Sequence, residues 1–181
     1  MAAATDKTLR MLGGLVAAAT LSVAASAGCA SAQPPGFPDL NSFSPVPADD
    51  YIVSNFRGTP GSRSMTFDTP YGLHCVMDAS NPKTLSSTGV RCSGKLPDSS
   101  TDDCSSGTVD GTGPAGSYRI TPDSGGCSLT VTGGSKQLGV GQKTTYQNVT
   151  CAVGADQLIA CLDTTSGNHG FVLKPSGSEA F

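Results

Sequence analysis

Cysteine is the residue type in this chain that most clearly indicates chemistry. Of the seven cysteines, six follow residue 70 and lie among Gly, Ser, Thr and Pro: Cys75, Cys92, Cys104, Cys127, Cys151 and Cys161. No two are separated by the two residues typical of zinc-binding pairs, so thiolate metal binding is disfavoured. An even number of cysteines without such motifs favours disulfides, which form in an oxidising compartment. We therefore expect six paired cysteines and no metal or other cofactor.

Sequence proximity favours one pairing of the six cysteines among the fifteen connectivities that are possible. The favoured scheme has three local pairs: Cys75–Cys92, Cys104–Cys127 and Cys151–Cys161. In the chain-entropy model, closing a loop of about 15 residues stabilises a domain by about 3 kcal/mol. Each pair would thus supply a large share of the stability of a small domain, and the other connectivities stay open.

Ser124 is the residue that most resembles an enzymatic nucleophile. Pro122-Asp123-Ser124-Gly125-Gly126 resembles the Gly-Asp-Ser-Gly-Gly loop of trypsin-like proteases, and His74-Cys75 resembles their His-Cys pair. However, Pro122 lacks the backbone N–H that this fold places in the oxyanion hole. His74 also precedes Ser124 by too few residues for a double β-barrel. A tight turn at Ser124 is the favoured interpretation.

Histidines and acidic residues give no stronger site. His74 and His169 could form a ligand or proton-transfer pair, but without a carboxylate at fixed spacing they make a poor metal site. We expect both at strand ends or turns, bonded to backbone. Four acidic residues lack the alternating spacing of a calcium loop and predict a solvated loop instead: Asp98, Asp102, Asp103 and Asp110. No catalytic residue is assigned.

The clearest structural element is a β-hairpin over residues 148–161. If Cys151 faces Cys161 across the two arms, Val153 opposes Ile159 on the same apolar face, because side chains alternate with period two. Gly154-Ala155-Asp156 supplies the turn, since Gly tolerates a positive φ and Asp bonds its local backbone.

Other short strands are separated by turns rich in Gly, Pro, Ser and Asn. The candidate strands span residues 51–56, 64–68, 73–77, 90–93, 128–132, 145–153, 157–162 and 170–174. Residues 94–116 contain few apolar side chains and predict a loop tied by Cys104. With 23 Gly, 12 Pro and no Trp, the composition favours a small, loop-rich, disulfide-stapled all-β fold, an antiparallel sheet forming a sandwich or an open barrel.

The N-terminus has the layout of an export signal. Lys7 and Arg10 precede an uncharged apolar run over residues 11–27, which is shorter than the roughly 20 residues that span a bilayer. We expect a signal peptide at 1–28, a proline-rich linker at 29–50 and a single β domain at 51–181. The linker could be an extended spacer, or Phe37, Leu40 and Phe43 could dock it on the domain.

Cys29 is the candidate lipidation site. Ser26-Ala27-Gly28-Cys29 resembles a bacterial lipobox, although Ser26 stands where an aliphatic residue is usual. Ala30-Ser31-Ala32 before Gln33 offers an ordinary secretory cleavage site instead. Both routes leave six cysteines to pair. We favour lipidation, which anchors the protein to the outer face of the cell membrane; free secretion is the alternative.

Short motifs along the chain carry a family resemblance. They are Thr69-Pro70-Tyr71-Gly72-Leu73-His74-Cys75, Val90-Arg91-Cys92, Thr150-Cys151, Ala160-Cys161, Gly167-Asn168-His169-Gly170-Phe171 and, in the linker, Phe37-Pro38-Asp39-Leu40. Together they resemble a family of small secreted or lipid-anchored six-cysteine proteins of mycobacteria and related actinobacteria, which has no assigned activity. The resemblance implies envelope localisation and six paired cysteines, and no catalytic role.

Charge narrows the possible partners. The net charge is −3 and the 11 Lys and Arg residues are scattered, whereas nucleic-acid binding needs a clustered basic surface. We expect a non-catalytic binding or structural role, with an envelope protein, a glycan or a lipid as partner. A small hydrophobic-ligand or glycan carrier is the first alternative, and a hydrolase with an unfamiliar site around Ser124 and His74 is the second.

Overall fold

Alternation of buried and exposed side chains explains why this chain forms sheets. In β5 (Gly89–Lys95), Val90 and Cys92 are buried whereas Arg91 and Lys95 are exposed. This period-two pattern is that of a strand with one face packed and one face toward solvent. The expected all-β fold is confirmed in the computed structural model.

The structure describes residues 33, 35–54, 61, 63–78, 89–98, 106–112, 117–123 and 134–181, which all belong to one compact unit, Ser31–Phe181. Within these ranges, twelve strands form two sheets of six. Sheet A has the order β1 (Ser44–Pro45), β8 (Gln142–Tyr146), β9 (Val149–Val153), β10 (Ile159–Asp163), β11 (His169–Leu173) and β12 (Glu179–Ala180). Sheet B has the order β2 (Ile52–Ser54), β3 (Arg63–Asp68), β4 (Leu73–Asp78), β5, β6 (Ser106–Asp110) and β7 (Arg119–Pro122).

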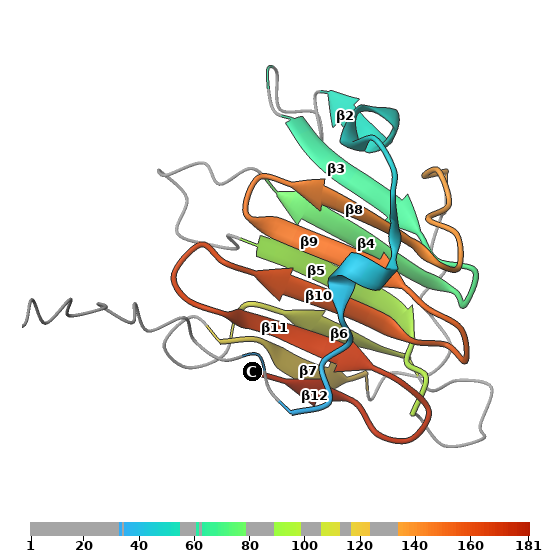
Figure 1. Cartoon of the computed structure of the whole chain (residues 1–181), viewed down its shortest axis with the longest axis vertical. Coiled ribbons are helices and arrows are strands. Elements are labelled where there is room, and N and C mark those ends of the chain that lie inside the picture. Colours follow the sequence, from blue (N-terminus) through green and yellow to red (C-terminus); the bar gives the residue numbers. More distant parts are fainter. Residues whose placement is uncertain are drawn as a thin grey trace, which may run out of the picture. The chain divides into compact units, whose positions relative to one another are not determined.

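The two sheets form a sandwich around one hydrophobic core (Figure 1). Neighbouring strands are antiparallel except for the parallel pair β1 and β8. Sheet B contributes Met65, Phe67 and Met77 to the core, and sheet A contributes Phe171 and Leu173, all with 1% exposure or less. Side chains from both inner faces therefore fill the space between the sheets.

Each sheet carries one disulfide between its two central strands. Cys75 of β4 bonds Cys92 of β5 in sheet B, and Cys151 of β9 bonds Cys161 of β10 in sheet A. In both pairs the two residues face each other in register and are fully buried. These two predicted disulfides are confirmed; the predicted Cys104–Cys127 pair lies outside the described residues. The bridges are compatible with an extracellular or exported protein.

The hairpin of β9 and β10 has the predicted register, but its turn differs. Val153 opposes Ile159, as expected. The positive φ angles fall at Asp156 (53°) and Gln157 (58°) and not at Gly154. Gly154 instead leaves room for Leu158, because a Cβ at residue 154 would lie 2.7 Å from Leu158 Cδ2 and the leucine side chain would have to move.

Three other sequence predictions also need correction or fall outside the description. The strand predicted at 145–153 is two strands, since a turn at Gln147 and Asn148 separates β8 from β9. The loop predicted at 94–116 contains β6, which was missed because Val109 is its one bulky apolar residue. The strand predicted at 128–132 lies outside the described residues.

The proline-rich arm before the sandwich crosses the outer face of sheet A (Figure 1). At one end, the Phe37 ring packs edge-on against Phe181, with centroids 5.8 Å apart. In the middle lies the 3-10 helix η1 (Leu40–Ser42), where the Leu40 carbonyl accepts a hydrogen bond from Lys143 Nζ at 2.7 Å. At the other end, β1 pairs with β8. Residues 37–45 are therefore docked on the domain and do not form an extended spacer.

Small side chains make room for the arm. Ala152, Ala160 and Val172 are adjacent in register on the outer face of sheet A, yet they are 0–5% exposed. After β1 the chain turns through the 3-10 helix η2 (Ala48–Tyr51) into β2 of the other sheet. No helix in the described part of the chain is long and apolar enough to span a membrane.

We predict that replacing both Cys151 and Cys161 by Ala lowers the free energy of unfolding by about 2–3 kcal/mol, because the bridge closes a 10-residue loop. Urea unfolding of the non-reduced protein measures the loss. Ser176→Ala, in an exposed turn, is the control. A double variant as stable as the parent would contradict a stabilising role for this bridge.

We also predict that Phe37→Ala costs about 1–2 kcal/mol, because it removes an aromatic pair that fixes one end of the arm. Val140→Ala, at a side chain that is 52% exposed, should change stability by less than about 0.5 kcal/mol. Thermal unfolding compares the two variants. Equal melting temperatures would show that the arm adds no stability through Phe37.

Candidate functional site

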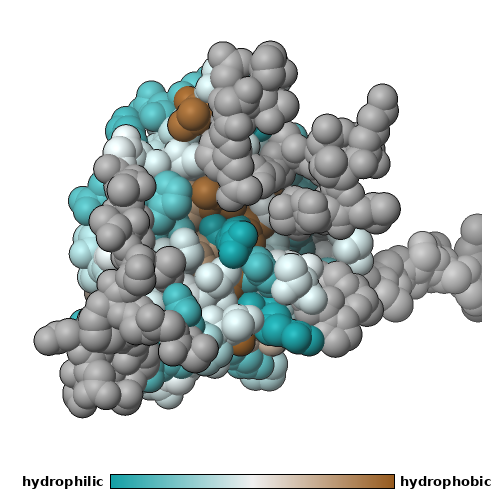
Figure 2. All heavy atoms as spheres, turned by 180° about the vertical axis from the view of Figure 1, so that it is seen from behind, coloured by the Kyte–Doolittle hydropathy of each residue, from teal (hydrophilic) through white to brown (hydrophobic). Residues whose placement is uncertain are grey.

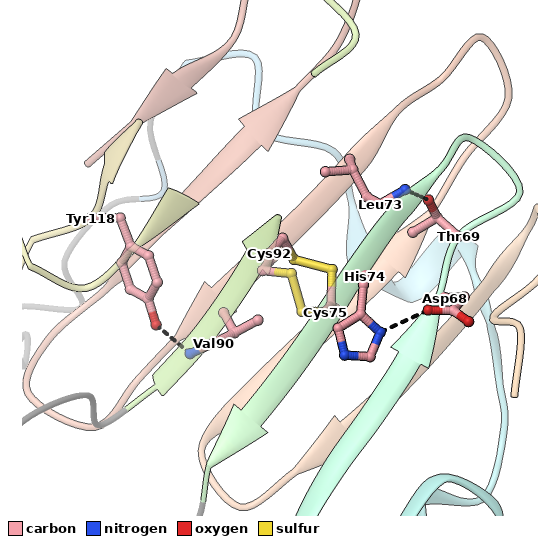
Figure 3. The surroundings of a disulfide bond; sticks show 10 residues. Asp68, Thr69, Leu73, His74, Cys75, Val90, Cys92 and Tyr118 are labelled. Atoms are coloured by element: carbon pink, nitrogen blue, oxygen red, sulfur yellow. Dashed lines mark hydrogen bonds and ion pairs between the residues drawn. A yellow bond between two sulfur atoms is a disulfide. The ribbon is translucent and has the colours of Figure 1, made fainter. Parts of the chain in front are cut away.

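His74 and Asp68 form a polar pair on the outer face of sheet B. Asp68 ends β3 and His74 is the second residue of β4, and the two are partners in the antiparallel register. His74 Nδ1 lies 2.7 Å from Asp68 Oδ1, as Figure 3 shows. A carboxylate accepts hydrogen bonds and does not donate them, so we assign the proton to Nδ1. Nε2 points away from Asp68.

The turn between β3 and β4 determines that Asp68 and His74 lie opposite each other. Thr69 N–H donates to the Leu73 carbonyl at 2.8 Å, and Leu73 N–H donates to Thr69 Oγ1 at 3.1 Å. Gly72 adopts a φ of +83° at the tight corner. The next pair outward on this hairpin is Asp68 with His74. The same turn therefore determines both the register and the contact.

Asp68 is also held by the segment that leads to sheet A. Its N–H donates to the Lys136 carbonyl at 3.1 Å, and its own carbonyl accepts from Leu138 N–H at 2.9 Å. Ser135 Oγ donates to Thr66 Oγ1 at 2.9 Å on the same strand. The carboxylate that orients His74 is thus fixed on a strand bonded on both sides.

His74 belongs to a polar row that crosses sheet B. Successive partners in register across β3, β4, β5, β6 and β7 are Asp68, His74, Ser93, Thr108 and Thr121. The side chains of such a row lie on one face, at the spacing of the strands, about 4.8 Å. We call this set the polar row. It places an imidazole in line with three hydroxyl groups, of which that of Ser93 is on the adjacent strand.

A second row beside the polar row carries charge. Arg91 of β5, Asp110 of β6 and Arg119 of β7 are neighbours on adjacent strands. Arg91 Nε lies 3.9 Å from Asp110 Oδ2, and the Arg91 side chain is 53% exposed. Asp110 Oδ1 accepts from Thr112 N–H and Oγ1, at 3.2 and 2.6 Å. Two arginines therefore flank one carboxylate that is already engaged.

The disulfide dictates which side chains face outward. His74 directly precedes Cys75, and Arg91 directly precedes Cys92. Because both cysteines point into the core, their neighbours point to the opposite face of the sheet. Figure 2, seen from behind Figure 1, shows a mixed surface with hydrophilic and neutral side chains around a small hydrophobic patch.

The structure brings together few of the residues singled out in the sequence. His169 begins β11 in sheet A, whereas His74 faces outward from sheet B, so the two histidines do not form a pair. Asp98 Oδ2 accepts from Ser178 N–H at 2.9 Å. Candidate residues outside the described ranges are Cys29, Asp102, Asp103, Cys104, Ser124 and Cys127. Among the described residues, no three His, Cys, Asp or Glu gather as a metal site.

The Asp68–His74 contact was missed in the sequence, although a signal for it exists. Thr69-Pro70-Tyr71-Gly72 lies between the strands predicted at 64–68 and 73–77, and a turn centred on Tyr71 pairs the residues equally distant on either side. Asp68 and His74 each lie three residues from Tyr71. Extending the hairpin register by one pair would have found the contact.

A second buried polar cluster connects the two sheets. Tyr118 OH donates to Asp163 Oδ2 at 2.9 Å and accepts from Val90 N–H at 2.9 Å. Asp163 Oδ1 accepts from Thr165 N–H. Burial raises the pKa of Tyr118 far above its ordinary value; the nearby Asp163 adds to this, and the Val90 N–H opposes it. Gly89 must lack a side chain, because a Cβ there would overlap the Tyr118 hydroxyl.

Comparisons of the chain with protein families, with curated proteins and with solved structures found no match. The geometry therefore has to define the site by itself. It consists of a fixed imidazole, a row of hydroxyls and a pair of arginines on one face of a disulfide-stabilised β-sandwich.

We predict that Tyr118→Phe lowers the free energy of unfolding by about 1–3 kcal/mol, because it leaves the Val90 N–H and the Asp163 carboxylate without their shared partner. Tyr146→Phe is the matched control, since its hydroxyl makes an exposed contact of 3.5 Å with the Arg63 carbonyl. Equal unfolding midpoints for the two variants would contradict a connecting role for Tyr118.

Alkaline unfolding adds a second readout. The raised pKa of Tyr118 means that the folded protein retains a proton that the unfolded chain releases near pH 10. Stability from this group is therefore complete below about pH 10 and falls as the pH rises further. The parent should lose stability more steeply than Tyr118→Phe above this pH.

Proposed function

We propose that this protein is an exported cell-envelope lipoprotein whose sandwich has a non-catalytic binding role, with the outer face of sheet B as its binding face. The observation that carries the binding role is the polar row from Asp68 to Thr121, with Arg91 and Arg119 beside it. The His74 imidazole in this row is held in place by the partly exposed carboxylate of Asp68, so a ligand would meet a ring of fixed orientation.

Export is supported by two features of the chain. The charged start and apolar run at residues 7–27 have the layout of a signal peptide, and the disulfides suit an oxidising compartment. Cys29 follows the run at a lipobox-like sequence. A lipid on Cys29 would hold the sandwich at the outer face of the membrane.

The choice of face follows from what the rest of the sandwich already contacts. The arm from Phe37 to Pro45 crosses the outer face of sheet A. The inner faces are filled by the core side chains and both cystines, which disfavours a carrier with an apolar ligand between the sheets. The outer face of sheet B presents polar side chains on fixed strands, as a binding surface requires.

A hydrolase is the second candidate, and the Asp68–His74 hydrogen bond is the observation that favours it. A carboxylate that fixes the tautomer of a histidine is part of known catalytic triads, and Ser93 lies opposite His74 in register. Hydrolysis of an activated ester that is lost in both His74→Gln and Ser93→Ala would support this candidate. Activity that persists in both variants would exclude it.

The intact mass of the protein from its native envelope tests the export and anchoring proposal. We expect a chain that starts at Cys29 with added acyl mass, and six thiols that can be alkylated only after reduction. Cys29→Ser should abolish the acyl mass and release the protein from the membrane fraction. A parent chain that starts at Gln33 without lipid would contradict the anchor and leave a secreted domain.

A further inference from the structure

We infer that the outer face of sheet B binds an acidic glycan, with the polar row contacting sugar hydroxyls and Arg91 and Arg119 contacting the anionic groups. This inference rests on the binding face proposed above and adds the class of ligand. The occupant is an extended polymer that lies across the strands.

The polar row matches the hydrogen-bonding needs of a sugar chain. With Nδ1–H donated to Asp68, Nε2 is the ring nitrogen left to pair with a hydroxyl group, accepting in the neutral ring and donating in the protonated ring. Ser93, Thr108 and Thr121 each provide a hydroxyl that both donates and accepts. A ligand rich in hydroxyl groups can pair with all four side chains, whereas a lipid tail can pair with none.

Charge on this face favours an anionic ligand. The whole chain has a net charge of −3, yet Arg91, Lys95 and Arg119 are exposed on the outer side of sheet B. Two carboxylates described on this face already have partners: Asp68 bonds His74, and Asp110 accepts from Thr112 and lies 3.9 Å from Arg91 Nε. Arg119 has no ion-pair partner among the described residues. The cations therefore keep donors for carboxylate or phosphate groups of a ligand.

Other macromolecules fit this face less well. Nucleic acid requires a larger cluster of cations than these three. Protein partners rely on buried aromatic anchors, and the described outward residues of β3 to β7 include no Phe, Tyr or Trp. An acidic glycan needs hydroxyl pairing and a few ion pairs, which is the combination that the two rows provide.

Isothermal titration of the chain from Gln33 onward with polygalacturonate and hyaluronate tests the inference, with neutral dextran as the reference ligand. We expect an acidic polymer to bind, dextran to bind far more weakly, and affinity to fall with added salt. Arg91→Gln should weaken binding about tenfold, because a charge-assisted contact is lost. His74→Gln should also weaken it, at unchanged salt dependence. Lys174→Gln, an equal charge change at the end of β11 in sheet A, should have no effect.

Several outcomes would overturn the inference. The first is that neither acidic polymer binds, and the second is that dextran binds equally well. The third is that Arg91→Gln and Lys174→Gln lose the same affinity for the acidic polymer, which would indicate nonspecific charge attraction. An envelope protein that is cross-linked to the parent but not to Arg91→Gln would replace the glycan with a protein partner. Thermal unfolding verifies that each variant is folded. If the protein carries the lipid but binds no glycan, only the glycan inference is wrong. If the protein lacks the lipid, the intact mass shows that the anchoring proposal is wrong.

Discussion

The register set by the two buried cystines is the constraint on which the rest of the molecule depends. Each bridge joins the central pair of strands in its sheet, at positions where the side chains point into the core. Once Cys75 and Cys92 face inward, the residues before them must face outward, since alternation along a strand leaves no other choice. The bridge in sheet B therefore stabilises the core and also presents His74 and Arg91 on one surface. A shift of one residue would turn His74 inward in β4 or Arg91 inward in β5, and it would expose a cysteine.

The remaining contacts make the two faces of the sandwich unequal. On sheet A, Ala152 and Ala160 are small enough for the N-terminal arm to lie over them, and Phe37 and β1 hold its two ends. On sheet B, the corresponding outer positions carry hydroxyls, charges and the oriented imidazole. Tyr118 and Asp163 connect the sheets through a buried hydrogen bond. The N-terminal segment thus covers the outer face of sheet A, whereas the outer face of sheet B presents polar side chains.

Sequence reasoning predicted the parts of the fold that depend on local signals. The all-β class, the Cys75–Cys92 and Cys151–Cys161 bridges and the pairing of Val153 with Ile159 follow from spacing and alternation. It missed β6 and β7, because strands with so little apolar content depend on neighbours distant in sequence. The Asp68–His74 pair was available from the hairpin register, but its link to Lys136 and Leu138 was not, since those contacts cross about 70 residues.

The two-residue strand β1 also affects how the edge of sheet A can meet other chains. An edge strand normally presents a line of N–H donors to which another chain can add, which is the start of aggregation. Here the amides of Ser44 and Val46 point inward to Gly141 and Lys143. The amide that alternation would turn outward belongs to Pro45, which has no N–H. The arm therefore ends this edge of sheet A with a strand that offers no outward N–H to another chain, so the same segment that covers the sheet also makes this edge a poor template for strand addition.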